Sequence, residues 1–184
     1  MLIEDILVNR AAVTLFTRPR RFGKTLNMSM IKYFFDVRNK DENRKLFEGL
    51  KIFGSEYMKE QGKYPVIFVS LKDLRANTWE MYLWEIKKLI SKIYREFQYI
   101  TEKMNEDDKE IYDSIKNRKN DMDLNTSIEL LSEYLFEYYG ERVIILKMFH
   151  NLPFPLHKIF YQILFYLAYS LFLSYLQIQH TNQK

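Results

Sequence analysis

The sequence predicts an α/β fold in which a parallel β-sheet is flanked by helices. Three short runs have the β-branched and aromatic composition of buried strands: residues 12–17 (AVTLFT), 66–70 (VIFVS) and 143–146 (VIIL). Amphipathic helical patterns separate these runs, and strands that alternate with helices are typical of parallel sheets. Of the 184 residues, 47% are apolar and 28% are charged, as in a globular chain with one domain of ordinary size.

The overall composition excludes some classes of protein. The net charge of +4 is small, so a nucleic-acid partner has only weak support, from the clustered Arg18, Arg20 and Arg21. The chain has no Cys, which excludes a disulfide-stapled secreted protein and any thiolate metal site. Residues 1–10 (MLIEDILVNR) carry acids where a signal peptide has a basic stretch and an apolar run. We therefore expect no export signal and a cytoplasmic location.

The first third of the chain predicts two helices around the first strand. Leu2, Ile3, Ile6 and Leu7 lie along one face of a short helix that precedes the strand. A loop at residues 18–23, which contains a proline, leads into a helix that begins at Lys24 and runs to about Val37. Apolar residues recur there at three- and four-residue steps: Leu26, Met30, Ile31, Phe34 and Phe35. A charged connector at residues 38–44 and a short helix with a turn in residues 45–57 are expected next.

Two more helices are expected after the second strand. The first runs to about Phe97, on the apolar face formed by Trp79, Leu83, Ile86, Ile90 and Ile93. Residues 102–123 are dense in charge and predict a solvated loop or exposed helix. Asn125 or Thr126 is expected to cap the next helix, which Gly140 ends before the third strand. The apolar face of that helix consists of Ile128, Leu131, Leu135 and Tyr138.

A phosphate-binding sequence lies where the loop after the first strand meets the next helix. It consists of Gly23, Lys24 and Thr25. In this context the backbone N–H groups from Phe22 to Thr25 can bind a β-phosphate at the helix N-terminus. Lys24 would reach the β- and γ-phosphates, and the Thr25 hydroxyl would bind Mg²⁺.

The residues before this sequence differ from the general motif G-x-x-x-x-G-K-[ST]. The motif has Gly at the position of Arg18. Arg20 and Arg21 add positive charge beside the expected phosphates. Alternatively, this is an ordinary helix N-terminus that contains Gly, Lys and Thr by chance. The expected strand before it and the expected helix after it favour a phosphate loop.

Residues 14–30 (TLFTRPRRFGKTLNMSM) resemble the AAA-ATPase-like family of prokaryotic P-loop ATPases, in which Arg-Pro-Arg-Arg-Phe precedes Gly-Lys-Thr. The resemblance covers about residues 1–146, with further matches at residues 46–52, 64–68, 139–140 and 143–146. It implies a P-loop NTPase domain with ATP and Mg²⁺ as cofactors, and self-association as in AAA-type relatives. The implied nucleotide-binding residues are Arg20, Arg21, Phe22, Gly23, Lys24 and Thr25, and Thr25 also binds the metal.

The resemblance stops at Leu146. In the family the third strand leads into an acidic pair, whose Asp orders the Mg²⁺ water shell and whose second acid polarises the attacking water. Here Lys147 follows instead, and no Asp or Glu occurs after Glu141. The sequence thus predicts an incomplete P-loop NTPase that binds ATP without hydrolysing it, and no catalytic residue is assigned. Family members have chain before this start and usually a PD-(D/E)xK nuclease-like domain after it, so we expect truncation at both ends.

The composition changes at the same residue, which divides the chain into residues 1–146 and an apolar tail of residues 147–184. The tail contains nine Phe and Tyr residues, all three His, and no Asp, Glu or Gly. Three interpretations are open: out-of-frame sequence after a frameshift, a membrane anchor over residues 159–178, or a buried helix. The second supports an alternative function, a membrane-tethered or partner-binding helical protein with a relic phosphate loop.

Overall fold

The computed structural model describes residues 2–9, 11, 13–16, 22–72, 74 and 76–148. The chain divides into two compact units, and residues 25–150 form the larger one. Within the smaller unit, helix α1 (Leu2–Asn9) confirms the predicted first helix and contains the buried Ile3. Residues 149–184, which make up nearly all of the predicted aromatic tail and include its expected helix, lie outside the described residues.

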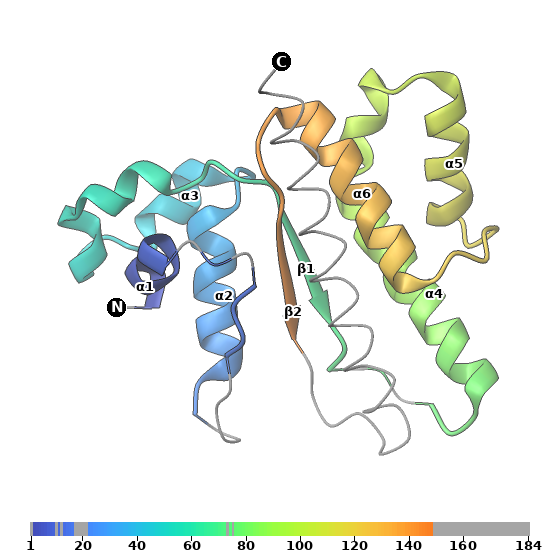
Figure 1. The fold of residues 1–184 in the computed structure, drawn as a ribbon, viewed down its shortest axis with the longest axis horizontal. Coiled ribbons are helices and arrows are strands. Elements are labelled where there is room, and N and C mark those ends of the chain that lie inside the picture. The colour runs from blue at the N-terminus through green and yellow to red at the C-terminus, as the bar shows by residue number, and fades with distance from the viewer. Residues whose placement is uncertain are drawn as a thin grey trace. The chain divides into compact units, whose positions relative to one another are not determined.

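The larger unit is built on a parallel two-stranded sheet. Strand β1 (Val66–Ser70) pairs with β2 (Ile144–Met148), with Val66 opposite Ile144 and Ser70 opposite Met148. The pairing extends past β1, where the Leu71 N–H donates to the Met148 carbonyl at 3.0 Å. Helix α2 lies on one side of the sheet and α4 and α6 lie on the other (Figure 1). The predicted α/β class is confirmed, with a small sheet and mostly helices.

The strand expected at residues 12–17 is a wrong prediction for the part that is described. Residues 13–16 form no strand, and Val13 and Leu15 are 49% and 68% exposed. A strand is stabilised by its hydrogen-bonded neighbour and by burial of one face, so a β-prone composition alone does not form one. The other two strands are confirmed, and β2 continues past Leu146 through Lys147 and Met148.

Helix α2 (Lys24–Phe35) confirms the expected helix and ends two residues earlier than predicted. Its last turn enters an aromatic cluster, because the Phe34 ring contacts those of Phe35 and Phe47 edge to face at 5.0 and 5.2 Å. Helix α3 (Lys40–Lys45) occupies most of the predicted connector 38–44. Two 3₁₀ helices, η1 (Lys51–Gly54) and η2 (Glu56–Glu60), occupy much of residues 45–57, where a short helix with a turn was expected. Short segments of this kind lack the repeated apolar spacing that identifies longer helices.

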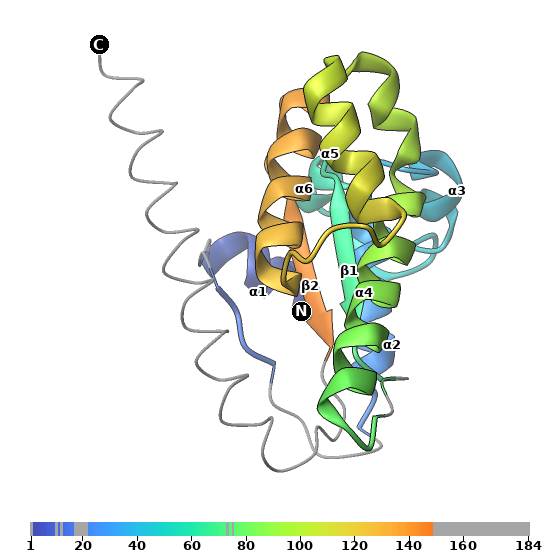
Figure 2. The same cartoon turned by 90° about the vertical axis from the view of Figure 1, so that its right-hand side faces the viewer.

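Three helices form the layer on the other side of the sheet, seen from that side in Figure 2. They are α4 (Trp79–Glu96), α5 (Glu106–Lys116) and α6 (Leu124–Tyr139), with the 3₁₀ helix η3 (Gln98–Lys103) between α4 and α5. Helix α4 confirms the predicted helix. The prediction that residues 102–123 are solvated is wrong for α5, because Tyr112 and Ile115 are 0% and 4% exposed.

Tyrosine hydroxyls join the three helices. The Tyr112 O–H on α5 donates to the Tyr94 carbonyl on α4, and the two rings lie 4.7 Å apart. The Tyr94 O–H in turn donates to the Ser127 carbonyl on α6 at 2.8 Å. Both phenols therefore satisfy their polar atoms inside the core, as buried tyrosines require.

Helix α6 is capped by Asp123, not by Asn125 or Thr126 as predicted. The Asp123 carboxylate accepts hydrogen bonds from the backbone N–H groups of Asn125 and Thr126 at 2.7 and 3.1 Å. Asp, Asn and Thr are all good N-cap residues, so the sequence alone does not choose among neighbours. The predicted end is confirmed, since Gly140 takes the left-handed conformation (φ 68°) that favours glycine.

Replacing Asp123 with Ala is expected to lower the free energy of unfolding by about 1 kcal/mol at neutral pH, the usual effect of losing a cap. Burial acts to raise the pKa of Asp123, but hydrogen bonds from Thr126 and Asn125 outweigh it and lower that pKa. A lowered acid pKa contributes stability at neutral pH that disappears as the pH falls through the folded-state value. Urea unfolding should therefore separate wild type from Asp123→Ala at pH 7, and the difference should shrink as the pH falls below the ordinary aspartate value of about 4.

Asp123→Asn is the matched control for this prediction. Asn also caps helices well but does not titrate, so it should keep most of the stability at pH 7 without the acid-dependent loss. Equal stability of wild type and Asp123→Ala at pH 7 would contradict the capping role.

Among the residues that the structure describes, no helix is long and apolar enough to cross a bilayer. The segment 159–178, for which a membrane anchor was one interpretation, lies outside that part of the chain.

Candidate functional site

The carboxyl edge of the sheet brings together the starts of helices and the ends of both strands. Strands β1 and β2 point toward the edge at which α2 begins, and α4 begins near it as well (Figures 1 and 2). In open α/β sheets, ligands bind outside the carboxyl ends of the strands. This edge is therefore the candidate site.

The start of α2 follows a glycine in the left-handed conformation. Gly23 has a φ of 70°, which favours glycine, and Lys24 is the first residue of the helix. The first turn of α2 contains no acid, so no carboxylate opposes the positive end of the helix dipole there. Lys24 is half-buried, while Phe22, Gly23 and Thr25 are exposed and accessible to a ligand.

Four of the six predicted nucleotide-binding residues are described. Phe22, Gly23, Lys24 and Thr25 lie in sequence at the start of α2, as the phosphate-loop prediction requires. Arg20 and Arg21 lie outside the described residues. Binding by these residues stays a prediction.

Lys147 occupies the carboxyl end of β2. It is the fourth residue of the strand and lies opposite Val69, which is 1% exposed. Its side chain is half-buried, and burial lowers the pKa of the Lys147 amine to about 8. In the described part of the chain no carboxylate forms an ion pair with this amine. Sequence reasoning noted the missing acid here but assigned Lys147 no role, although a cation directly after an apolar strand was the available signal.

The described residues at this edge offer few oxygen ligands for Mg²⁺. Mg²⁺ prefers oxygen ligands in octahedral geometry, and Thr25 offers one hydroxyl. Within the described ranges, no group of three or more His, Asp or Glu side chains is placed to hold a metal. At the end of β2, Lys147 presents an ammonium, which repels a metal cation.

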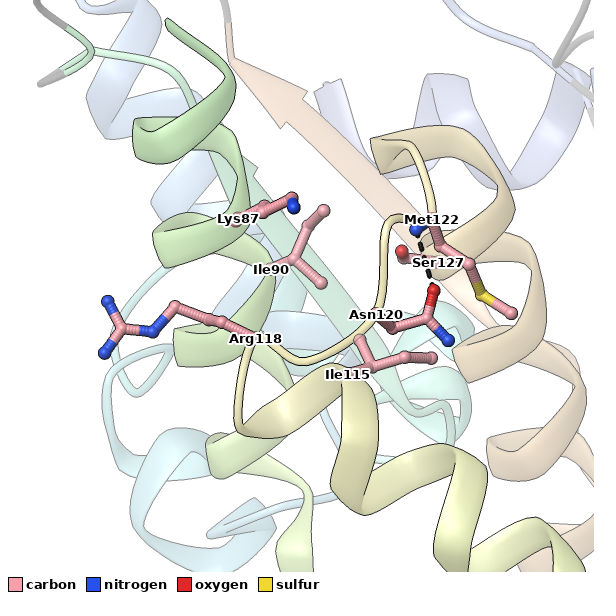
Figure 3. A pocket seen from close by; sticks show the side chains of 7 residues that line it. All are labelled: Lys87, Ile90, Ile115, Arg118, Asn120, Met122 and Ser127. Atoms are coloured by element: carbon pink, nitrogen blue, oxygen red, sulfur yellow. Dashed lines mark hydrogen bonds between the residues drawn. The ribbon is translucent and has the colours of Figure 1, made fainter. Parts of the chain in front are cut away.

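A small pocket away from this edge has a packing role. It lies among α4, α5 and α6 and the segment between the last two, and Figure 3 labels its lining: Lys87, Ile90, Ile115, Arg118, Asn120, Met122 and Ser127. Some of its polar groups have partners within the protein, since the Met122 N–H donates to Asn120 Oδ1 at 2.8 Å and Lys87 pairs with Asp121. The inter-helix segment uses this pocket to attach to the helices, and no free set of ligand-binding groups converges there.

Comparison with protein-family models matches residues 1–147 to a family described as predicted AAA-ATPase. The match includes the start of α2 and β1, and it ends inside β2 at Lys147. No curated protein and no solved structure matches the chain. The family match covers most of the 184 residues and confirms the resemblance found in the sequence. The chain belongs to the AAA-ATPase-like family of predicted AAA-ATPases.

Proposed function

We propose that the chain is an incomplete P-loop domain that binds ATP at the start of α2 and does not hydrolyse it. Membership of the family suggests nucleotide and metal use. The observation that carries the proposal is the left-handed Gly23 directly before Lys24, at a helix start on the carboxyl edge of the sheet.

The proposed binding mode uses main-chain and side-chain donors together. Backbone N–H groups at the start of α2 have no partner inside the helix and can donate to phosphate oxygens. Lys24 supplies a charge for the β- and γ-phosphates, and Arg20 and Arg21 precede it in the sequence. Phosphate binding of this kind depends on charge and on backbone geometry, so it tolerates variation in the loop sequence.

The absence of turnover follows from the chain's missing acids. Hydrolysis in P-loop ATPases needs one acid to order the metal's water shell and a second group to orient the attacking water. No Asp or Glu follows β2 in this sequence, and the strand itself ends in Lys147 and Met148. The chain is therefore expected to bind ATP without hydrolysing it and to release it unchanged.

Replacing Lys24 with Ala is expected to abolish ATP binding, because it removes the side-chain charge placed closest to the phosphates. The effect should reach at least about a hundredfold in Kd, equivalent to about 2.7 kcal/mol and within the range for hydrogen bonds to charged groups. Isothermal titration of the full chain with ATP measures it.

Lys45→Ala is the matched control, since Lys45 is an exposed lysine in the last turn of α3, away from the carboxyl edge. It removes the same charge from the chain and should leave the Kd for ATP within about twofold. An unchanged affinity in Lys24→Ala would contradict the assignment of the site, and equal losses in both variants would indicate non-specific attraction.

A further inference from the structure

We propose that the chain binds a second copy of itself through two different helices, with the outward face of α4 on one copy against the outward face of α6 on the next. Both helices lie within the larger compact unit. The inference goes beyond nucleotide binding and does not depend on it.

The outward face of α4 has an apolar end and a basic end. Five exposed residues share one stripe of the helix, because they recur at three- and four-residue steps: Met81, Trp84, Lys88, Lys92 and Arg95. Trp84 is 52% exposed, although a tryptophan side chain is largely apolar. An exposed apolar patch beside charged residues is typical of a surface that binds another protein.

The basic end of this face has charges that a partner can use. Lys88 lies over the Trp84 ring, 5.0 Å from its centroid, and pairs with Glu85 at 3.7 Å. Among the described residues, Lys92 and Arg95 have no ion-pair partner. Tryptophan and arginine are enriched among the residues that dominate the binding energy of interfaces. The face therefore fits an acidic surface that also offers an apolar side chain.

The outward face of α6 is such a surface. The helix contains three Glu and no Lys or Arg. Glu133 and Glu137 are exposed one turn apart, and Phe136 beside them is 45% exposed. Burial, and then the charges of Glu129 and Glu137, raise the pKa of Glu133. A cation brought there by another copy would relieve the repulsion among these acids.

The charges of the two faces match in spacing. Lys88 and Lys92 are four residues apart, and so are Glu133 and Glu137. In an antiparallel pair of helices, Lys92 can face Glu133 while Lys88 faces Glu137. Trp84, one turn before Lys88, then lies beside the last turn of α6 with its exposed phenylalanine. A parallel pair would place Trp84 beside the polar start of α6 instead.

The two faces lie on different flanks of the helical layer. In Figure 2, α6 lies to the left of α5 and α4 lies to its right. The contact therefore joins different surfaces of two copies, and each copy keeps one face free for a third. Contacts of this kind build rings or open chains of subunits instead of closed dimers.

Analytical ultracentrifugation of the full chain provides the first test. The weight-average mass should rise above the 22.5 kDa of one chain as the protein concentration increases. It should fall again when salt is raised from about 0.05 to about 0.5 M, because salt screens exposed charges. A mass of one chain at every concentration in low salt would overturn the inference.

Charge reversal provides the second test, with two double variants. Lys92→Glu with Arg95→Glu reverses the face of α4, and Glu133→Lys with Glu137→Lys reverses the face of α6. Each variant alone should associate at least about tenfold more weakly than the wild type, because like charges then face each other. An equimolar mixture of the two should recover association, because each variant keeps the natural face that the other lacks. Wild-type association of either variant, or a mixture that does not associate, would overturn the inference.

Two controls separate this contact from association through other parts of the chain. Lys45→Glu with Lys51→Glu makes the same change in net charge at exposed residues of α3 and η1, and should leave association within about twofold. Trp79→Phe leaves Trp84 as the single tryptophan of the chain. Its fluorescence should shift to shorter wavelength as copies associate, and a rising mass without this shift would overturn the inference. Circular dichroism checks that each variant is folded.

Discussion

Replacing Asp36 with Ala is expected to lower the free energy of unfolding by about 3 kcal/mol, because it removes one partner of a buried ion pair. Asp36 is 4% exposed. Its carboxylate accepts hydrogen bonds from Arg38 Nε, from an Arg38 terminal nitrogen at 2.7 Å and from the Arg38 backbone N–H. That terminal nitrogen also donates to the Val66 carbonyl at 3.2 Å, and the guanidinium lies 4.2 Å from the Phe97 ring centroid.

The substitution leaves the Arg38 guanidinium with Glu96, 3.8 Å away and 41% exposed, in place of a buried carboxylate. The Arg38 side chain lies just after α2 and contacts the Val66 carbonyl at the start of β1. It also contacts the ring of Phe97, the residue that follows α4. Burial acts to lower the pKa of Arg38, but the hydrogen bond and charge of Asp36 outweigh it and raise that pKa. Without Asp36 the guanidinium still stays charged, because arginine does not lose its proton in proteins, and its desolvation cost destabilises the folded state.

Urea unfolding of Asp36→Ala, Arg38→Met and the double variant measures this effect. Because the two side chains contact each other, the double variant should lose less stability than the sum of the single variants. Two results would contradict the proposed role of the pair. One is a loss of unfolding free energy below about 1 kcal/mol in Asp36→Ala, and the other is a double variant whose loss equals the sum of the two single losses.

Replacing Tyr112 with Ala is expected to lower the free energy of unfolding by about 3–5 kcal/mol, the usual cost of removing a large aromatic core side chain. Tyr112 is 0% exposed, and its ring contacts both Tyr94 and Tyr134 at 4.7 and 6.2 Å. The substitution opens a cavity between α4, α5 and α6 and removes a hydrogen bond to the Tyr94 carbonyl.

Two controls separate packing from other effects. Tyr112→Phe removes only the hydroxyl and should cost about 1 kcal/mol. Ile111→Ala removes a neighbouring apolar side chain on α5 that is 38% exposed, so its cost should be well below that of Tyr112→Ala. Equal stability of wild type and Tyr112→Ala would mean that α5 is the solvated element its charge density predicted.

Periodic apolar spacing identified the long elements correctly. Helices α2 and α4 lie where apolar spacing predicted them, although Leu26, Trp79 and Leu83 of the predicted apolar faces are exposed. Strands β1 and β2 coincide with two of the three predicted strands. Helix α5 was expected only as one alternative, an exposed helix, because its many charges obscure its two buried residues, Tyr112 and Ile115. The strand at residues 12–17 was predicted from composition alone, although strand formation also depends on a partner.

The candidate site was partly accessible to sequence reasoning. Gly, Lys and Thr at an expected helix start identified the beginning of α2, and the family resemblance was confirmed. The partial burial of Lys147 was not predicted, because it depends on the pairing of β2 with β1, which only the folded chain displays. The N-cap of α6 was misplaced for a related reason, since the choice among adjacent cap-forming residues is made by backbone geometry.

The most direct test of the central claim combines ATP binding and ATP turnover in one sample. The full chain is titrated with ATP, and phosphate release is then followed at saturating ATP with Mg²⁺ present. We expect saturable ATP binding that Lys24→Ala abolishes, with phosphate release no faster than in buffer. Failure to bind ATP, or phosphate release that depends on Lys24, would contradict it.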